Sequence, residues 1–284
     1  MSLVVTGATG QLGRHVVESL LARGAQPGDV LATGRDPQRL ADLAERGVVV
    51  RRADYSDPAS LTEALEGAHR VLLVSGNEFG QRVAQHTAVA RAAADAGVEL
   101  LAYTSAPYAA TTSLLLAGEH AATEAALHET GLPLALLRNA WYVENYTAQL
   151  PTYREHGMVG AAGEGRVSVA LRREYAAAAA TVLLGGDHAG ATYELGGPAV
   201  TLPEIAAALS DVTGEQIAYH DVPVATLVEI LTGAGLPADA AQVYADVDRG
   251  IAAGELEVPT DDLERLLGTA PLPLRDAVAE ALGR

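Results

Sequence analysis

Short apolar runs alternate with amphipathic segments through the first half of the chain. The apolar runs predict strands at Leu3–Thr6, Val30–Thr33, Val48–Arg52, Val71–Val74, Leu100–Thr104 and Leu134–Arg138. The amphipathic segments predict helices at Gln11–Arg23, Pro37–Arg46, Ala59–Leu65, Gln81–Ala96 and Glu119–Thr130. Near-continuous apolar strands that alternate with helices indicate a parallel sheet covered on both faces. The expected fold class is therefore α/β, with a Rossmann-type doubly wound sheet.

The regular alternation ends after Asn139. There, "NAWYVENYTAQL" is typical of a helix start and "EHGMVGAAGEGRVSV" of a glycine-rich loop with short strands. Further on, "REYAAAAATVLLGG" predicts a helix, "ATYELGG" a strand, and the tail from Thr201 small helices with one strand at "QIAYHDV". We predict a Rossmann domain over residues 1–140, to which residues 168–197 return, and a smaller C-terminal α/β lobe over residues 141–284.

Three glycines lie at the junction between the first predicted strand and the first predicted helix. Gly7, Gly10 and Gly13 form the pattern G-x-x-G-x-x-G, one residue wider than the usual dinucleotide fingerprint. We expect Gly7 to permit a tight turn, Gly10 to let a pyrophosphate reach the backbone, and Gly13 to let the helix lie close to the strand. The helix then presents free N–H groups to the phosphates. The alternative is a plain tight turn.

The end of the second strand, "ATGRDP", indicates which dinucleotide is bound. NAD binders place an acid there for the ribose 2′-hydroxyl. Here Gly34 leaves room for an extra phosphate and Arg35 can pair with it, which favours NADP(H) over NAD(H). Asp36 precedes Pro37 and is better interpreted as a helix cap.

Two further strand ends carry candidate residues. In "DYSD", Asp57 is expected to cap a helix, and Asp54 and Tyr55 either flank the adenine or have a structural role. In "VSGN", the small Ser75–Asn77 segment is expected to face the ribose of the cofactor.

Composition excludes several classes of function. The chain has 284 residues and a formal net charge of −17, which disfavours nucleic acids and anionic membranes as partners. It has no cysteine and no His/Asp/Glu cluster with metal-ligand spacing, so no metal site is expected. Without a long apolar run or a signal sequence, a cytoplasmic location is expected. All 19 basic residues are arginine, so the chain has no lysine.

Several stretches together resemble the NmrA-like group of atypical short-chain dehydrogenase/reductases, and within it the bacterial type 2 NADPH:quinone oxidoreductases. They include "TGATGQLGRHVVESLL", "ADYSDPASLTEAL", "LLVSGNEFGQRVAQH", "YTSA", "AGEHAATEAAL", "LLRNAWYVENY", "GAAGEGRVS" and "REYAAAAATVL". They run in order from residue 3 to about residue 185. "GQRVAQH" and "LLRNAWYVENY" are more specific to this branch than the glycine motif, and the C-terminal part fits more loosely.

The resemblance implies an NADPH-dependent enzyme that reduces quinones by two electrons in a cleft between two lobes. The cofactor-binding residues expected from the motifs and the resemblance are Gly7, Ala8, Thr9, Gly10, Gln11, Leu12, Gly13, Arg35, Ser75, Gly76, Asn77, Asn139, Tyr142 and Glu144. The expected partner is a small-molecule quinone, and the protein is expected to be a monomer or a homodimer.

The usual carbonyl-reducing machinery of short-chain dehydrogenases is missing. Ser105 follows the fifth strand as expected, but His120 and Glu124 stand where the helix would carry tyrosine and lysine. Quinones tolerate this loss because their reduced oxygen is a phenolate, so proximity of the reactants can supply most of the catalysis. The candidate catalytic proton donor is His120, because histidine titrates near neutrality. Its alternative role is packing, and Tyr108 is a second candidate donor.

Aromatic residues are scarce, which makes those near the site informative. Trp141 and Tyr142 offer flat faces for a quinone or nicotinamide ring, although Trp141 could equally fill the core between the lobes. Phe79 is a candidate lining residue of the quinone cleft. Arg172 and Arg173 either reach a phosphate or stay solvated. The missing tyrosine and lysine also suit a non-catalytic NADP(H) sensor of the NmrA type, and an aldehyde or enone reductase is a weaker third possibility.

Overall fold

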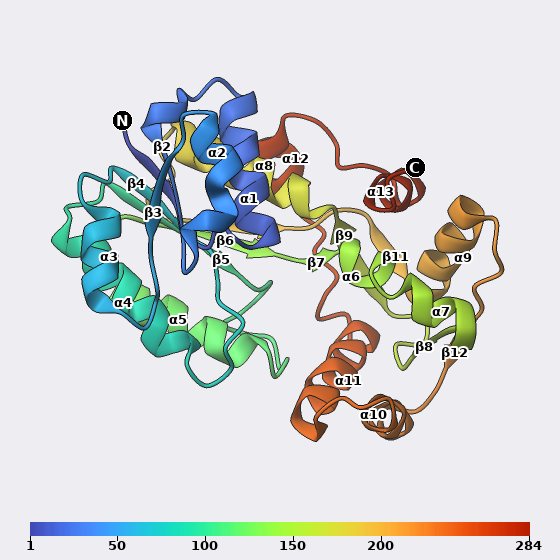
Figure 1. Ribbon diagram of the computed structural model, residues 1–284. Coiled ribbons are helices and arrows are strands. Elements are labelled where there is room, and N and C mark those ends of the chain that lie inside the picture. The colour runs from blue at the N-terminus through green and yellow to red at the C-terminus, as the bar shows by residue number, and fades with distance from the viewer.

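A seven-stranded parallel sheet forms the centre of the larger domain in the computed structural model, which describes residues 1–284 (Figure 1). The strand order is β10-β6-β5-β4-β1-β2-β3. The strands are β1 Leu3–Val5, β2 Val30–Gly34, β3 Val49–Arg52, β4 Arg70–Leu73, β5 Leu100–Ser105, β6 Leu134–Asn139 and β10 Ala191–Leu195. Successive residues of β1 face opposite cores, Leu3 and Val5 one and Val4 the other, which is why the strand is apolar throughout.

Helices cover both faces of this sheet, which confirms the predicted fold class. One face carries α1 Gln11–Ala22, α2 Ala41–Glu45, α8 Arg172–Leu184 and α12 Asp262–Leu267. The other carries α3 Pro58–Leu65, α4 Arg82–Asp95 and α5 Ala117–His128. The 3₁₀ turns are η1 Pro27–Asp29 and η2 Pro37–Leu40, and η2 replaces the first part of the helix expected over residues 37–46. No helix combines the length and hydropathy that crossing a bilayer requires.

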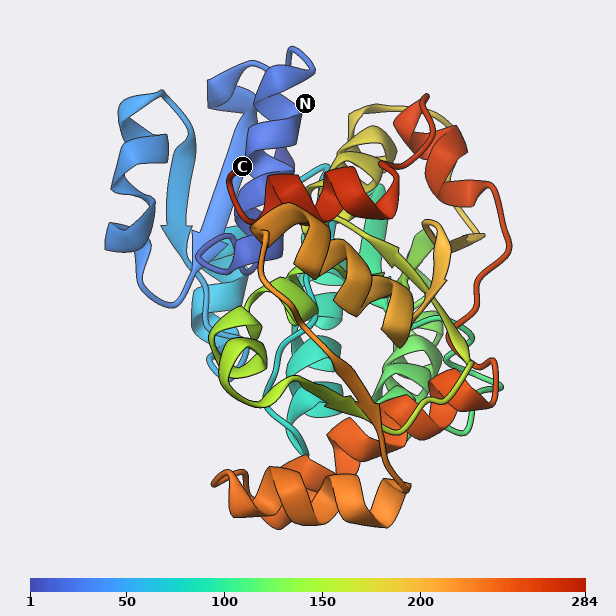
Figure 2. The same cartoon turned by 90° about the vertical axis from the view of Figure 1, so that its right-hand side faces the viewer.

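The smaller lobe lies beyond the carboxyl ends of the strands (Figures 1 and 2). Its strands are β7 Trp141–Tyr142, β8 Met158–Gly160, β9 Arg166–Ala170, β11 Ala199–Thr201 and β12 Tyr219–Asp221. Its helices are α6 Glu144–Thr147, α7 Leu150–His156, α9 Leu202–Thr213, α10 Val224–Gly233, α11 Ala238–Ala252 and α13 Leu274–Ala281. The strands form two small sheets, ordered β11-β9-β7 and β12-β8. A separate apolar core fills this lobe.

The chain crosses between the two parts more than once. Helix α8 packs along α1 and β10 pairs with β6, so residues 172–195 lie with the large sheet. Helix α12 also packs against α8, with Leu263 and Leu266 in the core of the larger domain. The expected helix start after Asn139 is wrong in part, because Trp141 and Tyr142 pair with β9 as a strand before the short α6 begins. This pairing joins the last strand of the expected Rossmann unit to the smaller lobe.

Candidate functional site

The sheet has its topological switch between β1 and β4. From β1 the chain runs outward through β2 and β3, and it then returns to the other side of β1 to form β4. Loops after β1 and β4 therefore diverge and leave a crevice at the carboxyl ends, where open α/β sheets bind ligands. A cavity of about 850 Å³ occupies this position. The predicted residues that line it are Gly7, Thr9, Gly10, Gln11, Leu12, Gly13, Arg35, Ser75, Gly76, Asn77 and Tyr142.

The glycine turn is shaped by close backbone contacts. Gly7 has φ +61°, a left-handed conformation that side chains rarely adopt. A Cβ added to Gly13 would lie 2.5 Å from the Gly7 carbonyl oxygen, so α1 can approach the turn only because residue 13 has no side chain. Ala8 is buried, and its N–H donates to the Thr33 oxygen at 2.8 Å. Ala8 therefore fixes the turn to β2 and does not line the cavity.

The Ser75–Asn77 segment is held by α4. The Gly76 N–H donates to Nε2 of His86 at 3.0 Å, and Nε of Arg82 donates to the Gly76 carbonyl at 2.9 Å. Burial, with the nearby Arg82 guanidinium, lowers the pKa of His86 to about 3. The imidazole is thus neutral, with its proton on Nδ1 towards Thr123. Both polar groups of the Gly76 backbone are fixed by side chains one helical turn apart.

Side chains of α4 and α5 also hold the rest of the loop after β4 by hydrogen bonds. Glu119 of α5 accepts the Gly80 N–H at 2.8 Å and pairs with Arg82 at 3.2 Å. Nε2 of Gln85 donates to Ser56 Oγ at 3.1 Å and to Glu78 Oε2 at 2.8 Å. Arg82, Gln85 and His86 were not among the expected site residues. Their signal was the helical spacing inside "GQRVAQH", which places all three side chains on the face towards the loop.

Arg35 lines the cavity, and its side chain is 72% exposed. Its Nη1 donates to Oε1 of Glu78, another lining residue of the cavity, at 2.9 Å. Asp36 accepts the Gln38 N–H and caps η2, so its carboxylate is engaged as the sequence predicts. The structure gives another reason for the glycine at position 34 than the expected room for an extra phosphate. A Cβ there would meet Thr9 side-chain atoms at 2.5 and 2.8 Å, so Gly34 makes room for Thr9.

The residues after β3 have a structural role as well as a place at the cavity. Both Asp54 and Tyr55 line it. The Tyr55 hydroxyl donates to the Val74 carbonyl at 2.9 Å and is hydrogen-bonded to Thr6, and burial raises its pKa. Tyr55 thereby ties the ends of β1 and β4 together beneath the crevice. The predicted cap also forms, because Asp57 accepts the Ser60 N–H at the start of α3.

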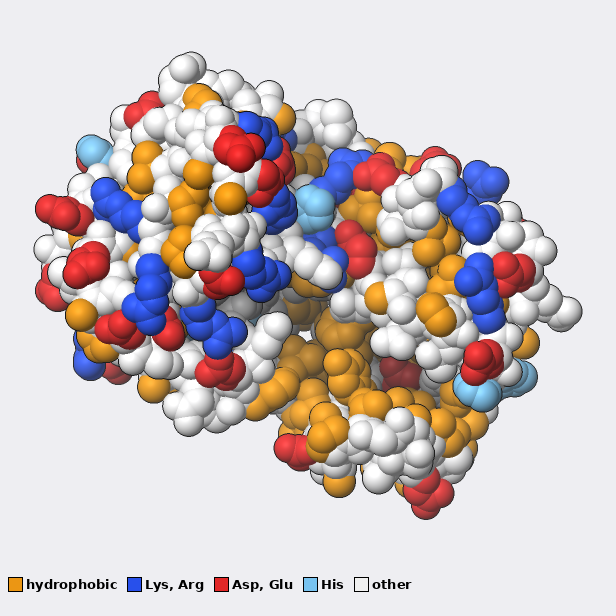
Figure 3. All heavy atoms as spheres, in the orientation of Figure 1, with side chains coloured by type: hydrophobic (Ala, Val, Ile, Leu, Met, Phe, Trp, Pro, Cys, Tyr) orange, Lys and Arg blue, Asp and Glu red, His pale blue; other side chains and the backbone are white.

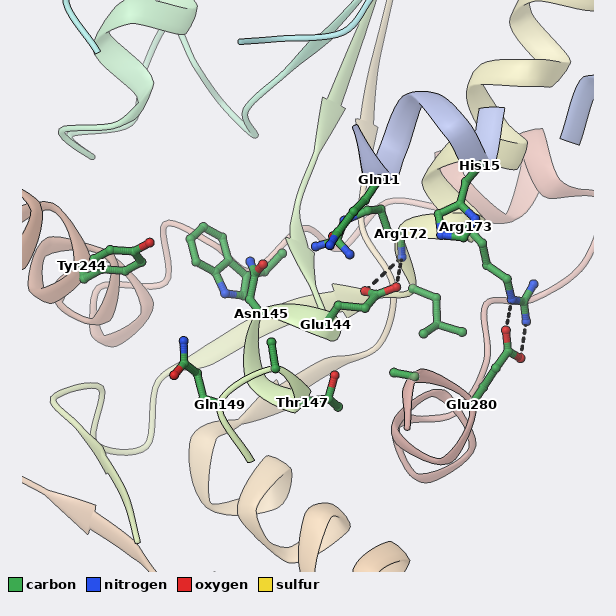
Figure 4. Close-up of a pocket in the computed structure, with 14 residues that line it drawn as sticks. Gln11, His15, Glu144, Asn145, Thr147, Gln149, Arg172, Arg173, Tyr244 and Glu280 are labelled. Atoms are coloured by element: carbon green, nitrogen blue, oxygen red, sulfur yellow. Dashed lines mark hydrogen bonds and ion pairs between the residues drawn. The ribbon is translucent and has the colours of Figure 1, made fainter. Parts of the chain in front are cut away.

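A second cavity of about 780 Å³ adjoins the first on the side of the smaller lobe (Figure 4). Both cavities are lined by Gln11, Asn145, Arg172 and Tyr244, so they form one continuous cleft between the lobes. Trp141 lines the second cavity. In the space-filling view the lobes are separated by a hollow with hydrophobic side chains at its lower end (Figure 3).

Glu144 belongs to this second cavity, not to the first. Its carboxylate accepts the Arg172 N–H at 2.9 and 3.1 Å, at the start of α8. The guanidinium of Arg172 lies 4.9 Å from the centre of the Tyr142 ring and has no carboxylate partner, whereas Arg173 pairs with Glu280. Asn139 is buried and its Nδ2 donates to the Tyr142 hydroxyl at 3.2 Å, while its Oδ1 has no partner.

His120 lies outside both cavities and is only 8% exposed. Its Nδ1 is 2.8 Å from the Tyr103 hydroxyl. Burial, followed by Arg82 and His86, lowers the pKa of His120 to about 3, so it carries no extra proton at neutral pH. Tyr108 also lies outside both cavities; its hydroxyl donates to the Glu257 carbonyl at 3.4 Å. The proton-donor roles of these two residues stay predictions.

Ser105 and Glu124 belong to a buried ion-pair network. Ser105 Oγ donates to Glu124 Oε1 at 2.6 Å, and Arg138 binds the same carboxylate through Nε and Nη2 at 2.9 and 2.6 Å. Arg138 also pairs with Glu194 at 2.7 Å, which links α5 to β6 and β10. These carboxylates raise the pKa of the Arg138 guanidinium. Glu124, at the helix position where lysine would be expected, is thus part of a structural ion pair.

Comparison with known proteins identifies the family. The model of the NmrA-like family matches residues 1–252. The chain belongs to the NmrA-like family. Among its relatives, quinone oxidoreductase 2 of Escherichia coli strain K12 is 43% identical over 279 residues, which are 98% of this chain and 97% of that protein. The resemblance predicted from the motifs is therefore confirmed.

Solved structures of NmrA-like relatives share the whole architecture. The NADPH-dependent quinone oxidoreductase of Escherichia coli, complexed with NADPH, is 42% identical, with a TM-score of 0.94 and 99% coverage of both chains. The triphenylmethane reductase of Citrobacter sp., complexed with NADP(H), is 36% identical, with a TM-score of 0.91 over 99% of this chain and 100% of that chain. Both of these relatives are reductases with a bound nicotinamide dinucleotide phosphate.

Proposed function

We propose that this protein is an NADPH-dependent quinone oxidoreductase. The observation that carries the proposal is the glycine-lined cavity at the start of α1, with Arg35 at one end and the interlobe cleft at the other. The Escherichia coli relative named for this activity and the Citrobacter relative complexed with NADP(H) support it. The proposed substrate is a small-molecule quinone, which is also the partner that the sequence predicts.

The residues of the cavity fit a nicotinamide dinucleotide phosphate. Gly10 is exposed at the cavity wall, and the first intrahelical bond of α1 runs from the Arg14 N–H to the Gly10 carbonyl at 3.1 Å. The N–H groups of Gln11, Leu12 and Gly13 precede it and have no acceptor within the helix, so they are free for a pyrophosphate. Arg35 would hold the 2′-phosphate through its planar guanidinium. The Ser75–Asn77 segment would contact the ribose from the opposite wall.

The unpaired Asn139 Oδ1 suggests where the nicotinamide end is held. A buried carbonyl oxygen without a hydrogen-bond partner is costly, and a ligand amide would satisfy it by donating to it, although Asn139 itself lines neither cavity. Asn139 ends β6, and its amide nitrogen is already directed to Tyr142. The predicted contribution of Asn139 and Tyr142 to cofactor binding therefore stays a proposal, in which the Asn139 Oδ1 is the atom that accepts from the cofactor.

When bound, NADPH supplies a hydride for two-electron reduction. The chain's own contribution is to position the reactants, because the buried Ser105 and Glu124 are hydrogen-bonded to each other and Glu124 is also held by the half-buried Arg138. We infer that the proton comes from water in the open cleft, since a hydroquinone anion is a weak base that needs no buried acid. His120, the predicted donor, is neutral, lines neither cavity, and is hydrogen-bonded to the fully buried Tyr103. It remains the protein group to test.

The acceptor ring would lie in the interlobe cleft among aromatic side chains. Tyr244 of α11 is 57% exposed and lines both cavities. Phe79 is 62% exposed at the cofactor cavity, with its ring 5.2 Å from Arg82, and Trp141 lines the second cavity. Exposed aromatic rings at a cleft bind flat apolar ligands by stacking.

The proposal is tested by mixing the protein with NADPH and a benzoquinone and following the nicotinamide absorbance. Stoichiometric hydroquinone formation over many turnovers is the expected result. Binding of NADPH without its oxidation would instead support the sensor function. A His120→Asn variant run beside the wild-type protein separates the proton routes. An unchanged kcat is expected if water is the donor, whereas a large fall in kcat with unchanged NADPH affinity would restore His120 as the donor.

A further inference from the structure

Glu78 occupies a position in the cofactor cavity that the glycine motif and Arg35 do not explain. It lies in the loop after β4, and both of its carboxylate oxygens are engaged. Oε1 accepts from Arg35 at 2.9 Å, and Oε2 accepts from the buried Gln85 at 2.8 Å. The Arg35 and Glu78 side chains are 72% and 48% exposed, so either can move without disturbing the core.

The residues around Glu78 make it the available carboxylate at this end of the cavity. Asp36 caps η2, and Asp54 accepts the Ser56 N–H and faces Arg52 at 3.6 Å. Glu78 differs because one of its two partners, Arg35, itself lines the cavity, so a ligand there can draw it away. Gln85 would then still hold the Glu78 carboxylate at the cavity wall.

We propose that Glu78 is a second determinant of dinucleotide preference. Its carboxylate competes with the 2′-phosphate for Arg35, and it accepts the ribose 2′-hydroxyl of a dinucleotide that lacks the phosphate. This inference rests on the proposed function, because it takes Arg35 as the ligand of the 2′-phosphate. Arg35 is paired in the free protein, so binding NADPH exchanges the Glu78 carboxylate for a phosphate of higher charge. Binding NADH leaves the pair in place.

The two halves of the proposal predict opposite effects of one substitution. Glu78→Gln keeps the size of the side chain and removes its charge. NADPH should bind about threefold tighter, because Arg35 is no longer held by a carboxylate. NADH should bind about threefold weaker, because a neutral amide is a poorer acceptor for the 2′-hydroxyl than a carboxylate. The NADPH preference should therefore rise about tenfold in total.

The measurement is isothermal titration of each dinucleotide into the full-length protein. Glu18→Gln is the matched control, because Glu18 lies two helical turns along α1 from Gln11, lines neither cavity, and forms a solvent-accessible pair with Arg46 at 2.7 Å. It carries the same change in net charge and should leave both affinities within experimental error. A Glu78→Gln variant with unchanged or weaker NADPH binding, or unchanged NADH binding, would overturn the proposal.

The Arg35→Ala background separates competition from simple charge repulsion. If Glu78 acts by holding Arg35, the gain in NADPH affinity from Glu78→Gln disappears in that background. A gain that persists unchanged overturns the competition. Arg35→Ala alone tests the underlying assignment. Equal loss of both dinucleotides would refute Arg35 as the phosphate ligand, whereas selective NADPH loss with a silent Glu78→Gln would remove only the role of Glu78.

Discussion

Gly13→Ala tests whether the close packing of α1 on the glycine turn shapes the phosphate site. The added Cβ would lie 2.5 Å from the Gly7 oxygen, 2.8 Å from the Gly7 carbonyl carbon and 2.9 Å from the Ala8 Cα. All three are backbone atoms, so no side-chain rotation relieves the contact. The start of α1 and the turn must move apart by about 0.5–1 Å to restore van der Waals distances.

The expected magnitude follows from two opposing effects. Overpacking of this kind costs about 1–3 kcal/mol, and replacing a helical glycine by alanine returns up to about 1 kcal/mol. The free energy of unfolding should therefore fall by about 1–2 kcal/mol. Displacement of the free N–H groups should weaken dinucleotide binding by at least about tenfold. NADPH and NADH should lose equally, because they share the pyrophosphate.

Urea unfolding and isothermal titration measure the two effects. Gly118→Ala is the matched control, because Gly118 lies in the first turn of α5 with nothing within 4 Å of the added Cβ. That variant should gain about 0.5–1 kcal/mol and bind normally. If Gly13→Ala is as stable as Gly118→Ala and binds both dinucleotides like the wild-type protein, the contact argument for the glycine pattern is wrong.

Three further perturbations probe other parts of the molecule. His86→Leu leaves the partly buried Gly76 N–H without an acceptor, so the KM for NADPH should rise about tenfold at nearly constant kcat, and His86→Gln should restore it. Arg138→Met leaves the buried Glu124 and the half-buried Glu194 without a cation and should cost about 3–5 kcal/mol in urea unfolding, against less than about 1 kcal/mol for Arg154→Met at an exposed pair. Burial raises the pKa of Asp248 from 3.8 to about 6, so the folded protein holds this proton more tightly than the unfolded chain. Relative to Asp248→Asn, wild-type stability should thus fall by up to about 3 kcal/mol as the pH rises from about 4 to about 6, measured by urea unfolding at a series of pH values.

For each of these three perturbations, one result would contradict the expectation. Equal KM values for His86→Gln and His86→Leu would show that the imidazole acts by packing and not as an acceptor. Equal losses for the two arginine variants would mean that the Arg138 network is no more than a surface pair. A stability difference for Asp248→Asn that is flat between pH 4 and pH 6 would place the carboxylate in water.

The sheet and its flanking helices were predictable because each depends on local patterning. Strands buried on both faces are apolar throughout, and Leu12, Val16, Val17 and Leu20 form one apolar stripe on α1. The chain beyond Asn139 was harder, because its strands are short and pair with distant segments. Nothing local in "WY" indicates that these two residues lie against β9, since that pairing depends on residues 169 and 170.

The candidate site was predictable where one backbone segment forms it and less so where side chains converge. The glycine turn, Arg35 and the Ser75–Asn77 segment all lie at the cavity. His86 and Arg82 of α4 bind the Gly76 backbone in the preceding loop. The helical spacing of these residues predicts that they share one face of α4, but it does not predict that this face contacts Gly76. His120 shows the converse, because its position in the chain suggests chemistry that only its burial and low pKa bring into question.

The ion pair at Glu124 bears on the kinds of acceptor that the proposed enzyme can use. A ketone is reduced to an alkoxide, a strong base that forms only with an acid at hand, and the tyrosine and lysine expected on α5 would supply that acid. Here the same helix is bonded through Arg138 to β6 and β10, and it stabilises the sheet. A site built in this way can hold two flat reactants together but has no lysine to activate a tyrosine. It should therefore reduce acceptors whose reduced form is already a stable anion, and leave simple ketones unreacted even when they fit the cleft.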